Sequence, residues 1–415
     1  MSEKSVLVMT GVGGVVGHHL ITKLQKEDKY EIRILSRNPE IVRANIADGN
    51  ILIASYDQQK RIISGSDTVI HLAARNNDLL GSADDFDRDN CELTKGLANT
   101  AKKLGVRHFI FSTSTKALNA KQDDIYGHSK FKAELELASL GDDDFRVSFL
   151  RLCPVYGHGT RGKLKYVKNL PFGLNKIALS IIRSFTPIVS ANKVAQFTVG
   201  LIDSKDPLEE LCISDTMGRG SLYFLFANLL NFAFIIAVPT LLLIPVIISA
   251  IAVPLTSPGG ILFIQPRVGT KQKVFSCRKF RTMREGTPIK GTHEVGKSYV
   301  TNVGAFLRKF KLDELPQATN VLFREMNLIG PRPCLETQTE LRRQRERYGV
   351  FDIRPGITGL GQCAGVDMSE PLKLSIFDHR YKAFRSVMLD VKIVLSTVLG
   401  KGFGDPVDSI KKANG

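Results

Sequence analysis

The sequence predicts an α/β protein in two parts that are joined by a long apolar segment. In residues 1–215, short β-type runs alternate with helical patterns, which is typical of a Rossmann-like doubly wound parallel sheet. From Leu222 to Leu255 there are 34 residues without a formal charge. The rest is basic and carries ordered Arg, Pro and Gly motifs. We therefore expect a first domain at 1–215, an apolar segment at 216–256 and a second domain at 257–415.

The strand expected at residues 5–10 ends in a glycine turn, and apolar residues at helical spacing follow it. Gly11 permits the tight turn, Gly14 lets a pyrophosphate approach the backbone, and Gly17 lets the helix pack close to the strand. The helix N-terminus would face the phosphates. This arrangement predicts a dinucleotide-binding site.

Arg37 follows the second strand, at 31–35, where an acidic side chain would bind the ribose of NAD and an arginine would accommodate the 2′-phosphate of NADP. We therefore favour NADP over NAD, although Arg37 can equally be a solvated loop cation. Further strands are expected at 51–54, 67–74 and 108–112.

Tyr126 and Lys130 share one face of the next helix, and Ser114 ends the strand before it. A phenol, with an ordinary pKa near 10, acts as an acid or base near neutrality only if a cation stabilises its phenolate. Lys130 is placed to do so. Ser114 would hold a substrate carbonyl or hydroxyl.

Residues 1–215 resemble the extended short-chain dehydrogenase/reductase family, which includes nucleotide-sugar epimerases, dehydratases and reductases. The resemblance implies catalysis by Ser114, Tyr126 and Lys130, and it places Asp57 near the adenine. Only 58 residues lie between Gly157 and residue 216, so the substrate-binding portion of the family is abbreviated. Either the second domain helps to bind substrate, or the cofactor fold is structural or regulatory. The matching motifs are Thr10-Gly11-x-x-Gly14-x-x-Gly17, His71-Leu72-Ala73-Ala74, Phe111-Ser112-Thr113-Ser114, Tyr126-x-x-x-Lys130 and Arg151-Leu152-Cys153-Pro154-Val155-Tyr156-Gly157.

The apolar run is too long for one straight membrane span and too short for two spans with a turn. As one helix it would reach about 51 Å at 1.5 Å per residue, whereas the hydrocarbon core is about 30 Å thick. Cations flank both ends, which favours the cytoplasmic side for both. We expect a re-entrant helix-break-helix with its bend at Pro245. A buried helix pair and a single tilted span are the alternatives.

The net charge of +16 is concentrated in the second half, where residues 259–415 contain 27 Lys and Arg against 15 Asp and Glu. An anionic leaflet or a phosphorylated substrate fits this surplus beside an apolar run, and no nucleic-acid partner is expected. The six scattered cysteines indicate neither a zinc module nor a disulfide framework. The N-terminal residues show no export signal.

Asp313 and Glu314 stand among cations in the second half. Such a pair at a helix start ordinarily interacts with the helix dipole or with water. Here it is followed by Gly330-Pro331-Arg332-Pro333 and by Arg354-Pro355-Gly356-Ile357-Thr358-Gly359, and this setting favours phosphate chemistry.

This second series of motifs resembles the bacterial sugar transferase family, the monotopic phosphoglycosyl transferases that start glycoconjugate assembly on a polyprenyl phosphate. The resemblance implies a mostly helical α/β domain and a bacterial inner-membrane enzyme on the cytoplasmic face. Asp313 would attack the β-phosphate of a UDP-sugar and release UMP, and polyprenyl (undecaprenyl) phosphate of the inner leaflet would then take the sugar phosphate from Asp313. Glu314 would be a metal ligand or an acid/base partner.

The residue chemistry agrees with this implication. A carboxylate nucleophile meets a diphosphate of the same sign, so a divalent cation and fixed cationic groups are needed. Mg²⁺ prefers carboxylate and phosphate oxygens, and Asp313 and Glu314 are the expected ligands. Lys311, with Arg281 and Lys309, is expected among lipid-headgroup contacts and has no assigned role. The candidate phosphate or nucleotide ligands are Lys279, Arg308, Arg332 and Arg354.

Together these predictions describe a bifunctional membrane enzyme. The first domain would reduce or epimerise C4 of a nucleotide sugar, and the second would transfer sugar 1-phosphate to the lipid carrier. The alternative is a transferase with a single activity, whose Rossmann-like domain is a binding or docking module. A homodimer is an oligomeric state that the sequence leaves open.

Overall fold

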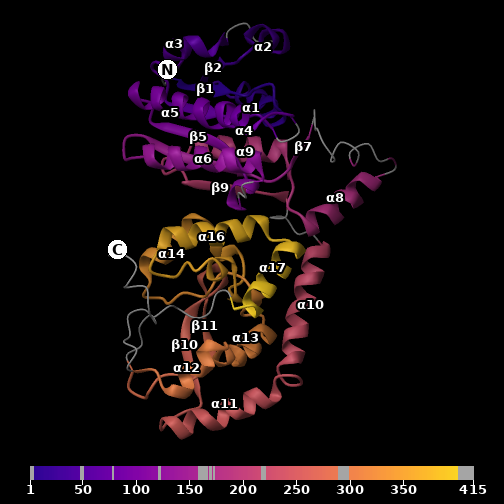
Figure 1. The fold of residues 1–415 in the computed structure, drawn as a ribbon, viewed down its shortest axis with the longest axis vertical. Coiled ribbons are helices and arrows are strands. Elements are labelled where there is room, and N and C mark those ends of the chain that lie inside the picture. Colours follow the sequence, from indigo (N-terminus) through magenta and orange to yellow (C-terminus); the bar gives the residue numbers. More distant parts are fainter. Residues whose placement is uncertain are drawn as a thin grey trace. The chain divides into compact units, whose positions relative to one another are not determined.

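The computed structural model describes residues 4–46, 51–76, 79–119, 123–157, 167, 171, 173–215, 221–287 and 299–400. The chain forms two compact units (Figure 1). The first consists of Met1–Arg183 and Pro187–Gly218, and the second of Ser184–Thr186 and Arg219–Gly415.

The first unit is built on a seven-stranded sheet in the order β3-β2-β1-β4-β5-β6-β9. All neighbouring strands run parallel, as expected for a doubly wound sheet. The order reverses between β1 and β4, and ligands bind at such a switch point, outside the carboxyl ends of the strands. The predicted α/β fold with a parallel N-terminal sheet is confirmed. The strands are β1 (Ser5–Thr10), β2 (Tyr30–Leu35), β3 (Leu52–Ala54), β4 (Thr68–His71), β5 (His108–Ser114), β6 (Arg146–Leu152) and β9 (Glu210–Ile213).

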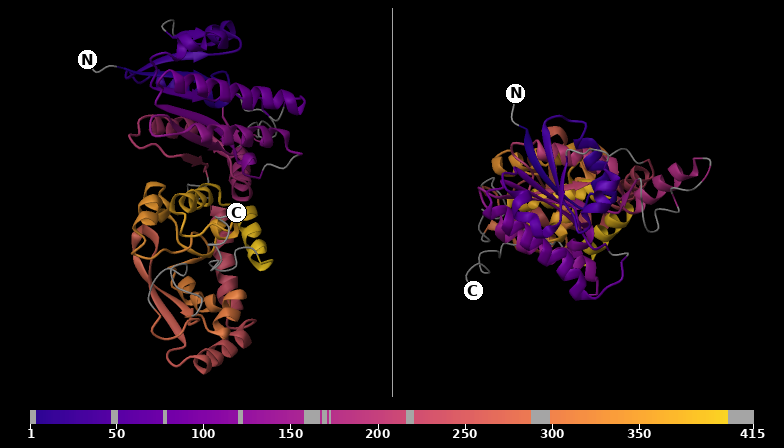
Figure 2. Two further views of the ribbon diagram at one scale, coloured as in Figure 1. Left: turned by 60° about the vertical axis from the view of Figure 1, so that its left-hand side comes forward. Right: turned by 90° about the horizontal axis from the view of Figure 1, so that it is seen from above.

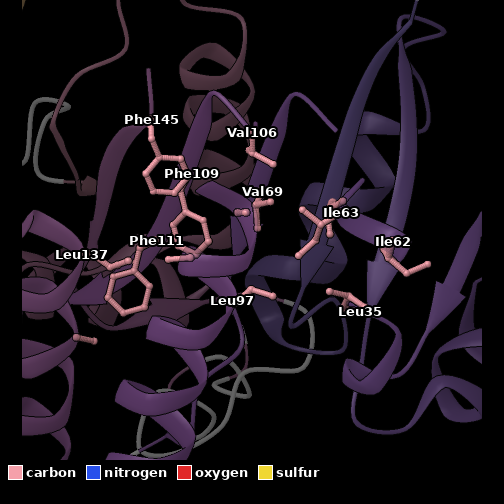
Figure 3. Close-up of a cluster of buried hydrophobic side chains, with 14 of the residues drawn as sticks. Leu35, Ile62, Ile63, Val69, Leu97, Val106, Phe109, Phe111, Leu137 and Phe145 are labelled. Atoms are coloured by element: carbon pink, nitrogen blue, oxygen red, sulfur yellow. The ribbon is translucent and has the colours of Figure 1, made fainter. Parts of the chain in front are cut away.

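Buried apolar side chains connect the strands to the helices of this unit. Figure 3 shows Phe109 and Phe111 of β5 in a cluster with Leu97 of α5 and Leu137 of α6. Fully burying one such side chain stabilises the fold by about 1.5–3 kcal/mol. The helices and the short strand pair are α1 (Val15–Leu24), α2 (Pro39–Asn45), η1 (Tyr56–Gln58), α3 (Gln59–Ile63), α4 (Ala83–Asp87), η2 (Arg88–Glu92), α5 (Leu93–Lys103), η3 (Thr115–Asn119), α6 (Ile125–Leu140), β7 (Val155–Tyr156), α8 (Leu174–Phe185), β8 (Val189–Ser190) and α9 (Ala191–Ile202).

The second unit combines helices with two small sheets, and its β10–β11 hairpin extends along one side in the left view of Figure 2. A parallel pair, β12 and β13, forms the other sheet. The elements are α10 (Ser221–Ala237), α11 (Leu243–Thr256), β10 (Leu262–Val268), η5 (Thr270–Gln272), β11 (Val274–Phe280), α12 (Asn302–Lys309), η8 (Leu312–Gln317), α13 (Ala318–Leu322), β12 (Asn327–Ile329), α14 (Thr339–Arg347), η9 (Val350–Asp352), β13 (Gly356–Thr358), α15 (Leu360–Cys363), α16 (Pro371–Phe384) and α17 (Val387–Val398).

The apolar run forms two helices, α10 and α11, with a break over residues 238–242 (Figure 1). The predicted bend at Pro245 is wrong. Pro245 is the third residue of α11, where the backbone N–H has no partner within the helix and proline is tolerated. Pro239 lies in the break instead, and a proline disfavours helical geometry at the residue before it.

Many apolar side chains of this segment face outward, among them Leu241, Ile244 and Leu255 at 82%, 70% and 79% exposure. Val253 on the other side of α11 is buried against Phe280 of β11. Within the residues that the structure describes, no helix has both the length and the apolar character needed to cross a membrane.

Two of the sequence motifs meet through their glycines. Gly330 N donates a hydrogen bond to Thr358 O at 2.9 Å, and Gly356 N donates one to Pro331 O at 2.8 Å. A Cβ on Gly356 would lie 2.0 Å from Gly330 N, so only glycine allows this approach. The approach holds the backbone that carries Arg332.

A buried ion pair binds the backbone of the loop that carries Arg332. Arg345 of α14 binds Asp378 of α16 through Nε and Nη2, at 2.9 and 2.7 Å, and its Nη1 donates to Arg332 O at 2.8 Å. Both side chains are almost fully buried, at 2% and 4% exposure. The pair therefore joins two helices to the backbone of Arg332.

A carboxylate at the start of α17 joins α10, α16 and α17. Asp390 accepts hydrogen bonds from Tyr223 Oη at 2.9 Å and from Tyr381 Oη at 3.1 Å. Burial raises the pKa of Asp390 to about 6, although the hydrogen bonds from the two tyrosines and the charge of Arg385 lower it in part.

We expect the stability of the second unit to fall as pH rises towards neutrality because of Asp390. The pKa of this carboxyl is higher in the folded than in the unfolded chain, so its contribution is complete below about pH 4 and is lost as pH rises through about 6. The shift corresponds to roughly 3 kcal/mol at most. Unfolding of Asp390→Asn and wild-type protein in detergent between pH 4.5 and 7.5 tests this. The variant should lose less stability, and parallel pH curves would contradict the expectation.

Arg345→Met should destabilise the protein by about 3–5 kcal/mol, because it leaves the Asp378 carboxylate buried without a counter-charge. The double variant Arg345→Met/Asp378→Leu should recover most of the loss, since an apolar pair of similar volume removes the buried charge. Chemical denaturation of both variants measures the two effects. Equal destabilisation by the single and the double variant would show that the buried charge is not the cause.

Candidate active site

The acid pair lies in η8, directly after a backbone turn at Lys311. Lys311 has left-handed geometry, with φ 55° and ψ 21°, and separates α12 from η8. Asp313 and Glu314 are buried, at 8% and 6% exposure. Most Asp and Glu side chains are exposed unless they are paired, so the pair is no ordinary solvated helix start.

Glu314 is held by two cations from distant parts of the chain. Lys279 Nζ of β11 donates to Glu314 Oε1 at 2.9 Å, and Arg332 Nη1 reaches the same oxygen at 3.4 Å. Burial by itself would raise the pKa of Glu314, but Lys279 and Arg332 outweigh it and hold the pKa at about 2. Glu314 is therefore ionised at neutral pH.

Asp313 has the opposite electrostatic environment. Burial, followed by the negative charge of Glu314, raises the pKa of Asp313, and Lys279, Arg308 and Arg332 only partly offset this. A more basic carboxylate is a better nucleophile once it is ionised. Neighbouring groups whose pKa values are pushed apart are typical of sites with two chemical roles.

The structure brings three of the four predicted cationic ligands close to the acid pair. Lys279 and Arg332 contact Glu314, while Arg308 donates from Nε to Thr282 Oγ1 at 2.9 Å and acts on Asp313 through its charge. Arg354 precedes β13, where burial and the charge of Arg324 lower the pKa of its guanidinium. Their roles as phosphate ligands remain predictions.

The acid pair fits a Mg²⁺ ion that is shared with a substrate. Among the described residues, no group of three or more His, Cys, Asp or Glu side chains forms a complete metal site. Mg²⁺ commonly uses one or two carboxylates together with substrate phosphates. Glu314 Oε2 is buried and has no hydrogen-bond partner in the described chain, so an oxygen ligand is available.

The sequence analysis missed Arg345 and gave Lys311 no role in the site. Arg345 positions the backbone of Arg332 through a contact with Asp378, 33 residues away, and no local pattern indicates such a pair. Lys311 lies two residues before Asp313, and its proximity in sequence was the available signal. Its ammonium is buried, with Glu314 as its main electrostatic partner.

In the first unit, the glycine turn lies at the switch point of the sheet. Gly11 has φ +72°, and an added Cβ would lie 2.5 Å from Ala73 N after β4. A Cβ on Gly17 would lie 2.3 Å from Gly11 O, so α1 packs tightly on the turn. At Gly14 the nearest atom would be Gly11 O, at 3.3 Å. This backbone leaves room at the start of α1, as a dinucleotide site requires.

The other predicted cofactor residues also follow the carboxyl ends of strands. Arg37 follows β2 and is largely exposed, and its Nη1 lies 3.3 Å from Asp89 Oδ2. Arg75 follows β4, and its Nη1 lies 3.1 Å from the same oxygen of Asp89. Asp57 lies in η1 after β3, exposed, and accepts a hydrogen bond from Ser55.

The three predicted catalytic residues of this unit lie on β5 and α6. Ser114 ends β5, and Tyr126 and Lys130 lie in the first turns of α6. Lys130 is fully buried and donates to Ser112 O at 3.0 Å, and burial lowers its pKa to about 7. The cation over the Tyr126 ring is Lys116, at 5.9 Å. The effect of Lys130 on the phenol therefore remains a prediction.

Two family models match different parts of the chain. The family model described as bacterial sugar transferase matches residues 222–401, and that of the NAD dependent epimerase/dehydratase family matches residues 7–186. A solved UDP-glucuronic acid 4-epimerase from Bacillus cereus, in complex with NAD, is 16% identical and covers 50% of this chain and 78% of its own, at a TM-score of 0.42.

Curated relatives match about two fifths of the chain. The UDP-glucose:undecaprenyl-phosphate glucose-1-phosphate transferase of Escherichia coli K12 is 40% identical over 173 residues, which are 39% of this chain and 37% of that protein. This chain thus spans well under half of that relative. The exopolysaccharide production protein ExoY of Rhizobium meliloti is 36% identical over 183 residues, which are 39% of this chain and 79% of that protein. Through its second half, the chain belongs to the bacterial sugar transferase family.

Proposed function

We propose that the second unit transfers sugar 1-phosphate from a UDP-sugar to undecaprenyl phosphate, with Asp313 as the covalent nucleophile. The observation that carries this proposal is the buried acid pair, in which cations hold Glu314 ionised while the pKa of Asp313 is raised. The relatives named above, one of them a UDP-glucose:undecaprenyl-phosphate transferase, support the choice of substrates.

In the first step, an Asp313 carboxylate oxygen attacks the β-phosphorus of the UDP-sugar. A phosphorus–oxygen bond to Asp313 forms while the bond to the bridging oxygen breaks, and UMP leaves with the electron pair. In the second step, a phosphate oxygen of undecaprenyl phosphate attacks the same phosphorus. The bond to Asp313 breaks, the carboxylate is restored, and the lipid carries a diphosphate-linked sugar.

Glu314, Lys279, Arg308 and Arg332 prepare the site for this chemistry. Lys279 and Arg332 neutralise Glu314, so that less negative charge opposes the approach of a diphosphate. Arg308 adds a positive charge near Asp313. Asp313 and Glu314 would hold Mg²⁺, which would supply further neutralisation of the phosphate oxygens.

We further propose that α10 and α11 insert into the inner leaflet from the cytoplasmic face as a re-entrant, monotopic anchor. Their exposed apolar side chains support this, as does the break between them. The basic surplus of residues 259–415 suits an anionic membrane surface. This placement would bring the acid pair within reach of a lipid phosphate.

The first unit is proposed to bind a nicotinamide dinucleotide and to modify C4 of the nucleotide sugar by reduction or epimerisation. Ser114 and Tyr126 would contact the sugar, and Lys130 would support the phenolate. Arg37 and Arg75 share one carboxylate, Asp89, which leaves a net positive charge beside the ribose position and favours NADP. Asp57 would lie near the adenine.

A second candidate is a transferase with one activity, whose first unit only binds the cofactor or a partner. The observation that favours it is the contact of Lys130 with Ser112 O, which directs the ammonium to a backbone carbonyl. Catalysis by the first unit therefore needs its own test.

Asp313→Asn should lower UMP release from a UDP-sugar by about a thousandfold or more, because the amide cannot form the intermediate. It should also abolish covalent retention of a radiolabelled sugar phosphate. Asp352→Asn is the matched control, because Asp352 is exposed in the same unit and pairs with Lys382. Wild-type UMP release by the Asp313 variant would refute the nucleophile assignment.

Tyr126→Phe should abolish nicotinamide oxidation with a panel of UDP-keto-sugars, because the phenol supplies the proton. Tyr30→Phe removes a hydroxyl from the same unit, where it bonds to Asp203, and serves as the control. Absorbance at the NADPH band measures turnover. If the wild-type protein shows none, or the Tyr126 variant equals it, the single-activity transferase is the better description.

A further inference from the structure

Lys311 combines two unfavourable features at one position beside the acid pair. Its backbone is left-handed, with φ 55° and ψ 21°, although it has a side chain. Its Nζ atom is buried and makes no hydrogen bond within the part of the chain that the structure describes. Left-handed geometry is disfavoured for any residue other than glycine, and a buried ammonium is unfavourable unless it is paired.

The other cations of the site are already engaged. Lys279 and Arg332 both bind Glu314 Oε1, and Arg308 donates to Thr282. The charge of Lys311 acts on Glu314 and Asp313, without a hydrogen bond to either. Its three donor hydrogens therefore have no acceptor among the described residues. Glu314 Oε2 is unpartnered in the same way.

The charge balance of the site indicates what kind of acceptor is missing. Four cationic side chains (Lys279, Arg308, Lys311 and Arg332) act on two carboxylates, so the formal charges of these six groups sum to +2, and a bound Mg²⁺ would add to this excess. A phosphoryl group supplies both the negative charge and several oxygen acceptors. A neutral sugar hydroxyl would leave the excess charge unbalanced.

We propose that Lys311 binds the phosphoryl group that Asp313 attacks, which is the β-phosphate of the nucleoside diphosphate donor. This inference rests on the proposed function. It assigns Lys311 to the donor and replaces the expectation of a lipid-headgroup contact. Lys311 lies two residues before the nucleophile, and the phosphoryl oxygens would accept the hydrogen bonds that its ammonium does not make within the described chain.

Lys311→Met tests this role because it keeps the unbranched apolar stem of the side chain, one atom shorter, and removes the charge. Binding of UDP should weaken about tenfold or more, the range for losing a charge-assisted hydrogen bond, while binding of UMP should change less than about twofold. The ligand-free variant should unfold at a higher temperature than the wild type, because it buries no ammonium that lacks a hydrogen-bond acceptor. A lysine with a purely structural role would lower the unfolding temperature and leave UDP binding unchanged.

Lys309→Met is the matched control, since Lys309 lies two residues earlier on the exposed side of α12. It should change UDP affinity less than about twofold. Calorimetric titration of the full chain in detergent with UDP and UMP measures these affinities. Equal weakening by both variants would reduce the effect to general electrostatics and overturn the inference.

A separate arm distinguishes the two sources of phosphate. In Lys311→Met, the KM for undecaprenyl phosphate should stay within about twofold of wild type. A raised KM for the lipid with unchanged UDP binding would make Lys311 a lipid contact and overturn the inference. UDP binding does not require a covalent step, so the two proposals can fail separately. If Asp313→Asn is inactive but Lys311→Met binds UDP normally, only the role of Lys311 is refuted. If Asp313→Asn is active, only the nucleophile assignment is refuted.

Discussion

The second unit depends on the buried carboxylate of Glu314. Lys279 from β11 and Arg332 from the loop after β12 both approach its Oε1, so one oxygen joins three segments that are distant in the sequence. The same contacts keep Glu314 ionised, and burial, followed by the charge of Glu314, raises the pKa of Asp313. The ion pairs of Glu314 therefore serve both the fold and the proposed chemistry. They hold the three segments together, and they give the two carboxylates different pKa values, as sites with two chemical roles require.

The surrounding backbone restricts how Arg332 can move. Gly330 and Gly356 approach so closely that any side chain would collide, and Arg345, paired with Asp378, binds the Arg332 carbonyl. The guanidinium of Arg332 is thus presented by a loop that is fixed on both sides. Such pre-organisation lowers the entropy lost when a phosphate binds.

Several elements were predictable from local sequence because local physics determines them. The glycine turn at Gly11, the parallel strands and the apolar run follow from backbone freedom and from hydrophobic patterning. The position of the bend in the apolar segment was predicted wrongly, because the sequence does not distinguish a proline that breaks a helix from one that a helix tolerates. Pro245 falls in a first helical turn, where it is tolerated, whereas Pro239 lies in the break. Whether a proline falls in the first turn of a helix or in a break depends on where the helix begins, and tertiary packing decides this.

The sequence by itself determined the composition of the candidate site: an acid pair, several cations and motifs rich in Gly, Pro and Arg. Only the tertiary structure decided which cations meet which carboxylate. It pairs Glu314 with Lys279 and Arg332, places Arg354 near the charge of Arg324, and buries the Lys311 ammonium with no hydrogen bond to any described residue. The physical reason is that charge, burial and distance act through space, and residues 35 or 18 positions apart in the chain become neighbours only after folding.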